Sequence, residues 1–115
     1  MKFEIIQTIK GNLTHYLELD EVISDSSTFL DILMNAGSET IVLSKEHFTP
    51  AFFDLKSGLA GDILQKISNY QRRLIILGDF RNIDKKSLRD LIYESNKTGK
   101  VIFEDSIEQA VEMLK

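Results

Sequence analysis

The chain has 115 residues, 43% hydrophobic and 28% charged, which is enough for one domain with a real core and too apolar for disorder. Its formal net charge of -4 argues against a general nucleic-acid binder, because such a protein needs a basic face. The absence of cysteine excludes disulfides, thiolate nucleophiles and cysteine-ligated metals.

The first third of the chain predicts a β-hairpin followed by a helix. Residues 2–19 alternate apolar and polar side chains on both sides of the turn sequence "KGN", which is typical of two antiparallel strands. Serine and aspartate at 24–28 indicate a helix N-cap, and apolar residues then follow helical spacing from Phe29 to a stop at Gly37.

The rest of the chain alternates between predicted strands and helices. Thr49 and Pro50 suit the cap and first position of a helix, and the run around 74–78 is the most apolar, as expected of an interior parallel strand. The predicted elements are strand 39–44, helix 49–70, strand 72–80, helix 82–99, strand 100–105 and helix 106–115.

This order, β-β-α-β-α-β-α-β-α, predicts a single α/β domain over residues 1–115. Its sheet should be mixed and mostly parallel, with right-handed crossovers and the N-terminal hairpin as an antiparallel edge. No stretch has the long apolar region of a signal peptide or approaches the about 20 apolar residues of a membrane span, so we expect a cytoplasmic protein without a membrane contact.

The segment "FFDLKSGLAGDIL" combines helical spacing with two glycines, Gly58 and Gly61, which disfavour a helix interior. If Ser57 is the N-cap, Gly58 stands at the first helical position, where its cost is small. The free N–H groups of that turn would then favour an anion. For Gly61 the sequence suggests a close approach of a neighbouring element, and backbone fit alone remains the other interpretation of both glycines.

Three segments of the sequence are similar to those of a known fold: "SGLAGDIL", "RRLIILGD" and "VIFEDSIEQAVEML". Together they resemble the STAS fold of anti-sigma-factor antagonists, over roughly residues 40–115. The resemblance implies a STAS-like domain in which Ser57 occupies the place of the phosphorylated serine. The chain departs from that pattern at one position. Those proteins have an aspartate two residues before the phosphorylated serine, where this chain has Leu55. Asp54 lies three residues before Ser57, and Lys56 comes between Leu55 and Ser57.

A second resemblance spans nearly the whole chain. The segments "FFDLKSGLAGDILQKISNYQRRLIILGDF" and "KSLRDLIYESNKTGKVIF" are similar to the signature segments of a family of small bacterial proteins, the domain of unknown function DUF4180. This resemblance implies a family and no activity.

The function that we infer from these features is a non-catalytic regulatory or protein-interaction module. Its working surface would run from Phe53 to Asp62, with the partner- or anion-binding candidates Asp54, Lys56, Ser57, Gly58, Leu59 and Gly61, and with Ser57 as the phosphoacceptor candidate. The partner would be another protein, and a homodimer stays open. The alternative is a small-molecule or nucleotide site at the helix N-terminus around Ser57 and Gly58.

A hydrolase built on Ser57 ranks last. Its base would be His47 with Asp54, but the segment lacks the Gly-x-Ser-x-Gly elbow. His15 and His47 fall on different elements without further ligands, so they predict neither a metal site nor a cofactor.

Other side chains have ordinary interpretations. Phe48, Phe52 and Phe53 are expected in the core, with one ring left partly outside, and Leu64 and Ile76 are both expected to be buried. The pairs Arg72–Arg73 and Lys85–Lys86 are expected on a solvated face, and Glu104–Asp105 at a helix entry.

Overall fold

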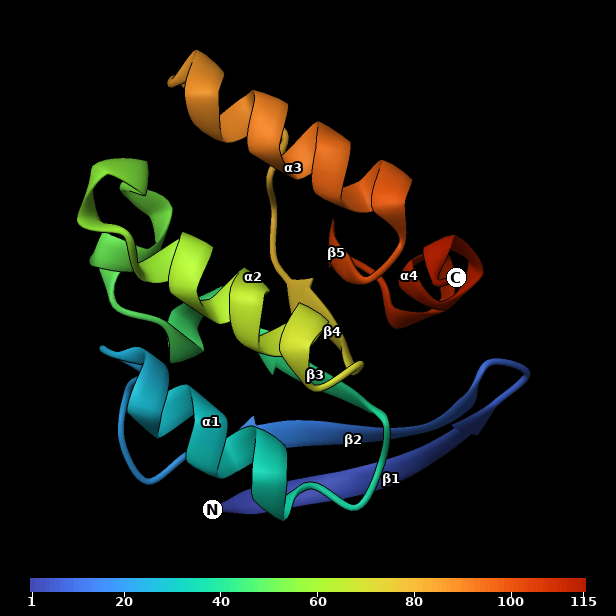
Figure 1. The fold of residues 1–115 in the computed structure, drawn as a ribbon. Coiled ribbons are helices and arrows are strands. Elements are labelled where there is room, and N and C mark those ends of the chain that lie inside the picture. Colours follow the sequence, from blue (N-terminus) through green and yellow to red (C-terminus); the bar gives the residue numbers. More distant parts are fainter.

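The computed structural model describes residues 1–115 as one α/β unit with a five-stranded sheet and four α-helices. Figure 1 shows these elements along the chain. The strands are β1 (Lys2–Thr8), β2 (Gly11–Glu18), β3 (Thr40–Ser44), β4 (Arg73–Leu77) and β5 (Val101–Glu104). The α-helices are α1 (Ser26–Asn35), α2 (Leu59–Asn69), α3 (Lys86–Thr98) and α4 (Ile107–Met113), and three 3₁₀ turns, η1 (Lys45–His47), η2 (Pro50–Phe53) and η3 (Leu55–Ser57), lie between β3 and α2.

The sheet runs in the order β1-β2-β3-β4-β5, so that every strand lies beside its neighbour in sequence. β1 and β2 are antiparallel, while β2, β3, β4 and β5 are parallel. The predicted mixed sheet is therefore confirmed, and β4 is an interior strand as its apolar run indicated. The hairpin turn is Ile9–Lys10, closed by the pair Thr8 and Gly11.

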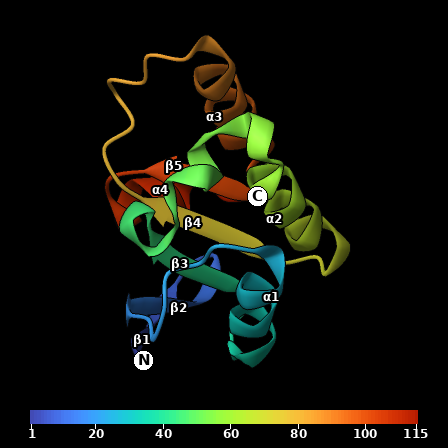
Figure 2. The ribbon, with the colours of Figure 1, turned by 90° about the vertical axis from the view of Figure 1, so that its left-hand side faces the viewer.

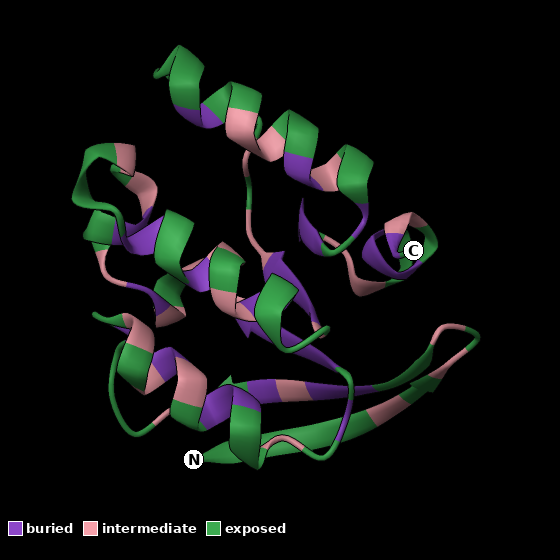
Figure 3. Cartoon of the chain, in the orientation of Figure 1, coloured by how far each residue is buried: buried purple, intermediate pink, exposed green.

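The two faces of the sheet are covered unequally. Side chains from α1 and α2 pack with one face of the strands in a cluster of 17 buried residues, against which α3 adds partly buried leucine and isoleucine side chains. The other face carries a cluster of 7 buried residues under α4, including Val42, Ile75 and Ile102 from the strands. Figure 2 shows α1, α2 and α3 on one side of the sheet, and Figure 3 shows the buried central strands beside a largely exposed β1.

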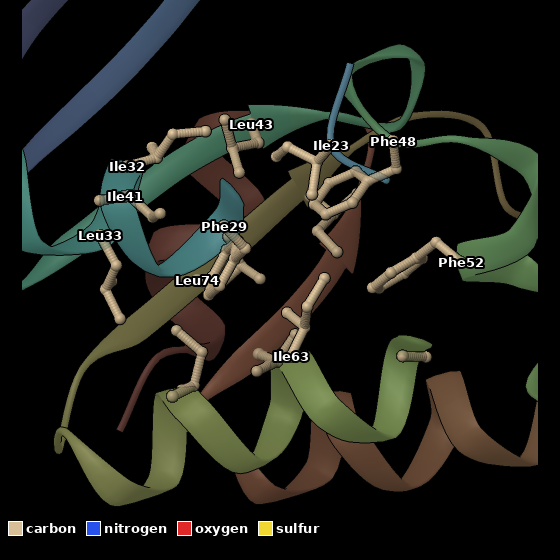
Figure 4. Packing of buried hydrophobic residues seen from close by; sticks show 14 of the residues in the cluster. Ile23, Phe29, Ile32, Leu33, Ile41, Leu43, Phe48, Phe52, Ile63 and Leu74 are labelled. Carbon is tan, nitrogen blue, oxygen red and sulfur yellow. The ribbon is translucent and has the colours of Figure 1, made fainter. Parts of the chain in front are cut away.

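The larger core is closed at one end by aromatic rings. Phe52 is fully buried and its ring lies 4.4 Å from that of Phe48 between centroids. Figure 4 shows both rings beside Ile63, Leu74 and the aliphatic side chains of α1 and β3. As expected, the third phenylalanine, Phe53, is only partly buried.

The predicted helix 49–70 is wrong in its first part. Thr49 does precede a turn with Pro50 at its first position, but that turn is 3₁₀ and its Thr49 hydroxyl caps nothing. Asp54 interrupts the turns by accepting a hydrogen bond from the Lys56 N–H, and the α-helix begins only at Leu59. The prediction for Leu64 is also too strong, because its side chain is half-buried while Ile76 is fully buried.

Arg72 and Arg73 do not form a solvated face. One Arg72 amino group, Nη2, donates to the carbonyls of Leu33, Ala36 and Ser38 at 3.0, 3.3 and 2.7 Å, so it satisfies the C-terminal end of α1. The Arg73 side chain is buried and its Nε donates to Thr40 Oγ1 at 2.8 Å. None of the helices is long and apolar enough to cross a bilayer.

Candidate functional site

The segment singled out in the sequence lies where the parallel strands β3, β4 and β5 end. Since β3 is followed by the 3₁₀ turns and then by α2, these turns and the N-terminus of α2 stand at the carboxyl ends of the strands. Ligands and partners of open α/β sheets commonly bind at this edge. The location therefore suits the predicted surface.

Aromatic packing holds the start of this segment, around Phe53, against the rest of the domain. Phe53 lies edge-on to Phe52, with 4.9 Å between ring centroids, and 6.3 Å from Phe80 of the loop after β4. Phe80 and Phe52 both contact Phe103 of β5, at 5.4 and 6.5 Å. Rings from three parts of the chain therefore anchor the start of this segment, at Phe52 and Phe53.

Ser57 is one residue away from the N-cap position that the sequence predicted. The N-cap of α2 is Gly58, and Ser57 is the last residue of the 3₁₀ turn η3. The Ser57 hydroxyl nevertheless accepts a hydrogen bond from the Leu59 N–H at 3.2 Å, and it donates to the Ala51 carbonyl at 2.6 Å. It thus satisfies one free N–H of the helix and ties η2 to the start of α2.

The two glycines have different physical reasons. Gly58 has φ +82°, in the left-handed region that a residue with a Cβ adopts only at a cost, so the prediction that it occupies an ordinary first helical position is wrong. Gly61 is exposed in the first turn, and a Cβ added there would meet no atom within 4 Å. The expected close approach of a neighbouring element at Gly61 is therefore also wrong.

The remaining candidates divide between surface and core. Asp54 and Lys56 are exposed, and Asp54 Oδ1 accepts from the Lys56 N–H at 3.3 Å. Leu59 is buried in the main core, so its side chain is not part of any surface. The exposed strip consists of Asp54, Lys56, Ser57, Gly58 and Gly61, and we call it the serine turn.

The serine turn also leaves helix N–H groups without a protein acceptor. In the first turn of α2 the Leu59 N–H is bonded to Ser57 and the Asp62 N–H to the Gly58 carbonyl. The intervening N–H groups of Ala60 and Gly61 have no hydrogen-bond partner in the protein. They lie beside the Ser57 hydroxyl in sequence and on the same helix end.

The structure does not assemble Ser57, His47 and Asp54 into a catalytic group. His47 Nδ1 accepts from the Ser44 N–H at 3.0 Å, and burial lowers the pKa of its imidazole. No hydrogen bond joins His47 to Ser57 or to Asp54, since each is bonded elsewhere. His15 lies on the hairpin, where its Nδ1 is 3.2 Å from Glu4 Oε1, and no group of three or more potential ligands is arranged for a metal ion.

A neighbouring feature was missed by the sequence reasoning. A pocket of about 240 Å³ opens between the loop after β4, the end of β5 and α3. Asp79 on its rim accepts two hydrogen bonds from the Arg81 guanidinium, each at 2.9 Å, and these hold the pKa of the Asp79 carboxyl well below its usual value. The sequence signal for this pocket is "GDFR", directly after the central strand. Ligands of open α/β sheets bind at the carboxyl ends of the parallel strands, which is where this segment lies.

A larger cavity, about 500 Å³, lies at the opposite end of the sheet. It is formed between the C-terminal parts of α2 and α3, with Leu64, Ile67 and Val101 as its apolar lining. Arg72 also borders it, but its guanidinium is already engaged with the carbonyls that end α1. The cavity shares no lining residue with the serine turn.

The molecule is thus a mixed α/β domain with a serine turn at the carboxyl ends of its parallel strands. The chain belongs to the family described as domain of unknown function (DUF4180), whose model matches residues 10–114. This confirms the family predicted from the sequence. No curated protein and no solved structure matches the chain.

Proposed function

We propose that this domain is a non-catalytic regulatory module of STAS-like character that binds another protein through the serine turn. The observation that carries the proposal is the placement of Ser57. Ser57 is exposed at the carboxyl edge of the sheet, and its hydroxyl is held by two hydrogen bonds in a segment that begins at the packed rings of Phe52 and Phe53. A partner that docks there meets a preorganised surface, which lowers the entropic cost of binding.

Two features support the STAS-like part of the proposal. Helices α1, α2 and α3 connect successive strands of a mixed sheet, and the serine stands at the start of the helix that follows β3. In the resemblance drawn from the sequence, this is the place of the regulatory phosphoserine. We also propose the bacterial cytoplasm as its compartment, on the same resemblance.

Phosphorylation of Ser57 has a clear physical consequence. A phosphoryl group would end the donation from the hydroxyl to the Ala51 carbonyl, which at present ties η2 to α2. Its charge would lie at the N-terminus of α2, where the helix dipole and the unpartnered N–H groups of Ala60 and Gly61 favour an anion. The modification would therefore change the exposed turn and leave the helix stable.

The second candidate function rests on the N-terminus of α2. A small phosphorylated molecule or nucleotide could place an anionic oxygen against the N–H of the exposed Gly61 without any modification of the chain. Ser57 would then orient the ligand rather than carry the phosphate. Isothermal titration with inorganic phosphate separates this function from the first, because the protein-binding module has no requirement for a free anion.

The test of the leading proposal uses four baits: the wild type, Ser57→Ala, Ser57→Asp and the control Ser27→Asp. Ser27 is exposed in the first turn of α1, so the control adds the same charge at another helix N-terminus. Captured proteins from the source cell are quantified by mass spectrometry. We expect at least one protein retained by the wild type to change at least tenfold with Ser57→Asp and to stay unchanged with Ser27→Asp.

Identical captured sets for all four baits contradict the regulatory role of the serine turn. A change that Ser27→Asp also produces contradicts it equally, since added charge rather than the position of Ser57 would then be responsible. Circular dichroism and urea unfolding of each variant establish that the baits are folded.

A further inference from the structure

The edge of the sheet formed by β1 has no strand beside it. β1 pairs with β2 on one side only, and the sheet order places it at the end of the five strands. Figure 1 shows β1 running along this open edge, with α1 over the adjacent part of the sheet. An unpaired edge offers backbone hydrogen bonds to another strand, which proteins usually prevent with outward charges, proline or short strands.

The register of the hairpin determines which backbone groups face outward. The turn Ile9–Lys10 closes on the pair Thr8–Gly11, and a pair that closes a two-residue turn exchanges both of its backbone hydrogen bonds. Bonded and non-bonded pairs alternate along an antiparallel ladder, so Ile6 and Glu4 also face β2. The N–H and C=O groups of Phe3, Ile5 and Gln7 therefore point to the open edge.

The side chains of these three outward-facing residues carry no charge. Phe3 is opposite Tyr16 and Ile5 is opposite Thr14, which places both on the sheet face that α1 covers. Phe3 is 56% exposed and Ile5 is 51% exposed, although both are large and apolar. The edge thus joins free backbone groups to a half-exposed apolar strip, and Lys2 and Glu4 point to the other face.

We propose that a second copy of this chain pairs with β1 in antiparallel orientation, forming a continuous sheet of both subunits about a two-fold axis at Ile5. In this register Ile5 lies opposite Ile5 of the partner subunit, and Phe3 lies opposite the partner's Gln7. Every outward-facing residue of β1 then lies opposite a residue of the partner subunit's β1. The exposed parts of Phe3 and Ile5 become buried between the two α1 helices.

Charge selects this register over its neighbours. A shift by two residues in one direction brings Glu4 opposite the partner's Glu4, and like charges in that position are destabilising. A shift in the other direction leaves Phe3 opposite the turn residue Ile9 and brings Lys2 opposite Lys10 of the partner subunit. In the proposed register Glu4 lies opposite Ile6 and Lys2 opposite Thr8, so no like charges meet.

The interface uses a surface separate from the serine turn. Because β1 has only 7 residues, pairing along it buries less than the about 800 Å² per partner of a standard interface. We therefore expect a reversible dimer whose population depends on protein concentration. A partner strand from another protein would instead leave the isolated chain monomeric.

Sedimentation velocity over a concentration series tests the proposal. The wild type should move from a mass of 13.2 kDa at low concentration toward twice that value at high concentration. Ile5→Lys places two like charges at the two-fold axis and should keep the protein monomeric, as should Ile5→Glu. An equal mixture of these two variants should recover the dimer, which a misfolded variant could not do. The control Ile9→Lys changes an equally apolar side chain, 91% exposed on the turn, and should dimerise as the wild type does.

Hydrogen exchange gives a second measurement that needs no substitution. The amides of Phe3, Ile5 and Gln7 should become protected as the concentration rises, by tenfold or more, while those of Glu4 and Ile6 are protected throughout. A wild type that stays at 13.2 kDa up to millimolar concentration overturns the proposal. So does a dimer that Ile5→Lys leaves intact, or one in which the three outward amides still exchange freely.

Discussion

Substitution of the two glycines of the serine turn by alanine should change stability in opposite directions. Gly58 has φ +82°, and an alanine forced into the left-handed region costs about 1–2 kcal/mol. Gly61 is exposed within α2 and its Cβ would meet nothing within 4 Å, so alanine should stabilise the helix there by about 0.5–1 kcal/mol.

These magnitudes convert into measurable shifts of the melting temperature. An unfolding entropy of about 2.1 cal/mol/K per residue makes 1 kcal/mol equivalent to about 4 °C for a domain of this size. Gly58→Ala should therefore lower Tm by about 4–8 °C, and Gly61→Ala should raise it by about 2–4 °C. Urea unfolding followed by circular dichroism checks the same free energies at constant temperature.

The control for the first substitution is Gly58→Asn, because asparagine adopts the left-handed region more readily than alanine and should lose less stability. Destabilisation by Gly61→Ala would mean that a neighbouring group packs against that position, contrary to the open space around it. A neutral Gly58→Ala would mean that α2 begins with an ordinary backbone conformation. Either result refutes the explanation of why one helix start carries two glycines.

The remaining predictions concern the core, a helix end and pH. Ile76→Ala should cost about 2–5 kcal/mol in urea unfolding, whereas the half-buried Leu64→Ala should cost about 1–2 kcal/mol, and equal losses would contradict their different burial. Arg72→Lys cannot reproduce the planar contact with the carbonyls at the end of α1 and should cost about 1–3 kcal/mol; retained stability would show that water satisfies them. Burial lowers the pKa of His47 in the folded state, so the unfolded chain binds the proton more readily, and stability should be full above pH about 6.5 and fall as the pH decreases below it. His47→Gln should flatten this dependence between pH 7 and pH 5, and an unchanged slope would assign it to another group.

The sequence pattern was sufficient to predict those elements whose structure is determined by residues close together in the chain. The apolar run of β4 predicted an interior strand because only a strand covered on both faces can be apolar at every position, and the structure has it so. The serine at 106 predicted the start of α4, where its hydroxyl accepts from the Gln109 N–H at 3.1 Å. In both cases the cause lies within a few residues of the effect.

Features that depend on distant partners were not predictable in this way. Arg72 looked like a surface residue, but the carbonyls that it satisfies belong to residues 33 to 39, which adjacent sequence does not reveal. The sequence predicts one helix over 49–70 because Thr49 and Pro50 suit a helix start and the helical spacing after Gly58 is compatible with its continuation. The rings of Phe52 and Phe53 instead pack on Phe103 and Phe80, which are distant in sequence, and the backbone between them forms 3₁₀ turns. The sequence predicts Ser57 as the N-cap of α2, one residue before the actual N-cap, Gly58. Composition does not show that Gly58 takes the left-handed conformation.

The position of α4 in the chain has a consequence for synthesis. α4 alone covers the second face of the sheet, and it follows all five strands in sequence. A chain emerging from the ribosome N-terminus first can form its strands while Val42, Ile75 and Ile102 still face solvent on that side. Until α4 has been synthesised, the nascent domain therefore has an apolar surface that no earlier element can shield. We expect the domain to depend most on a chaperone during that time.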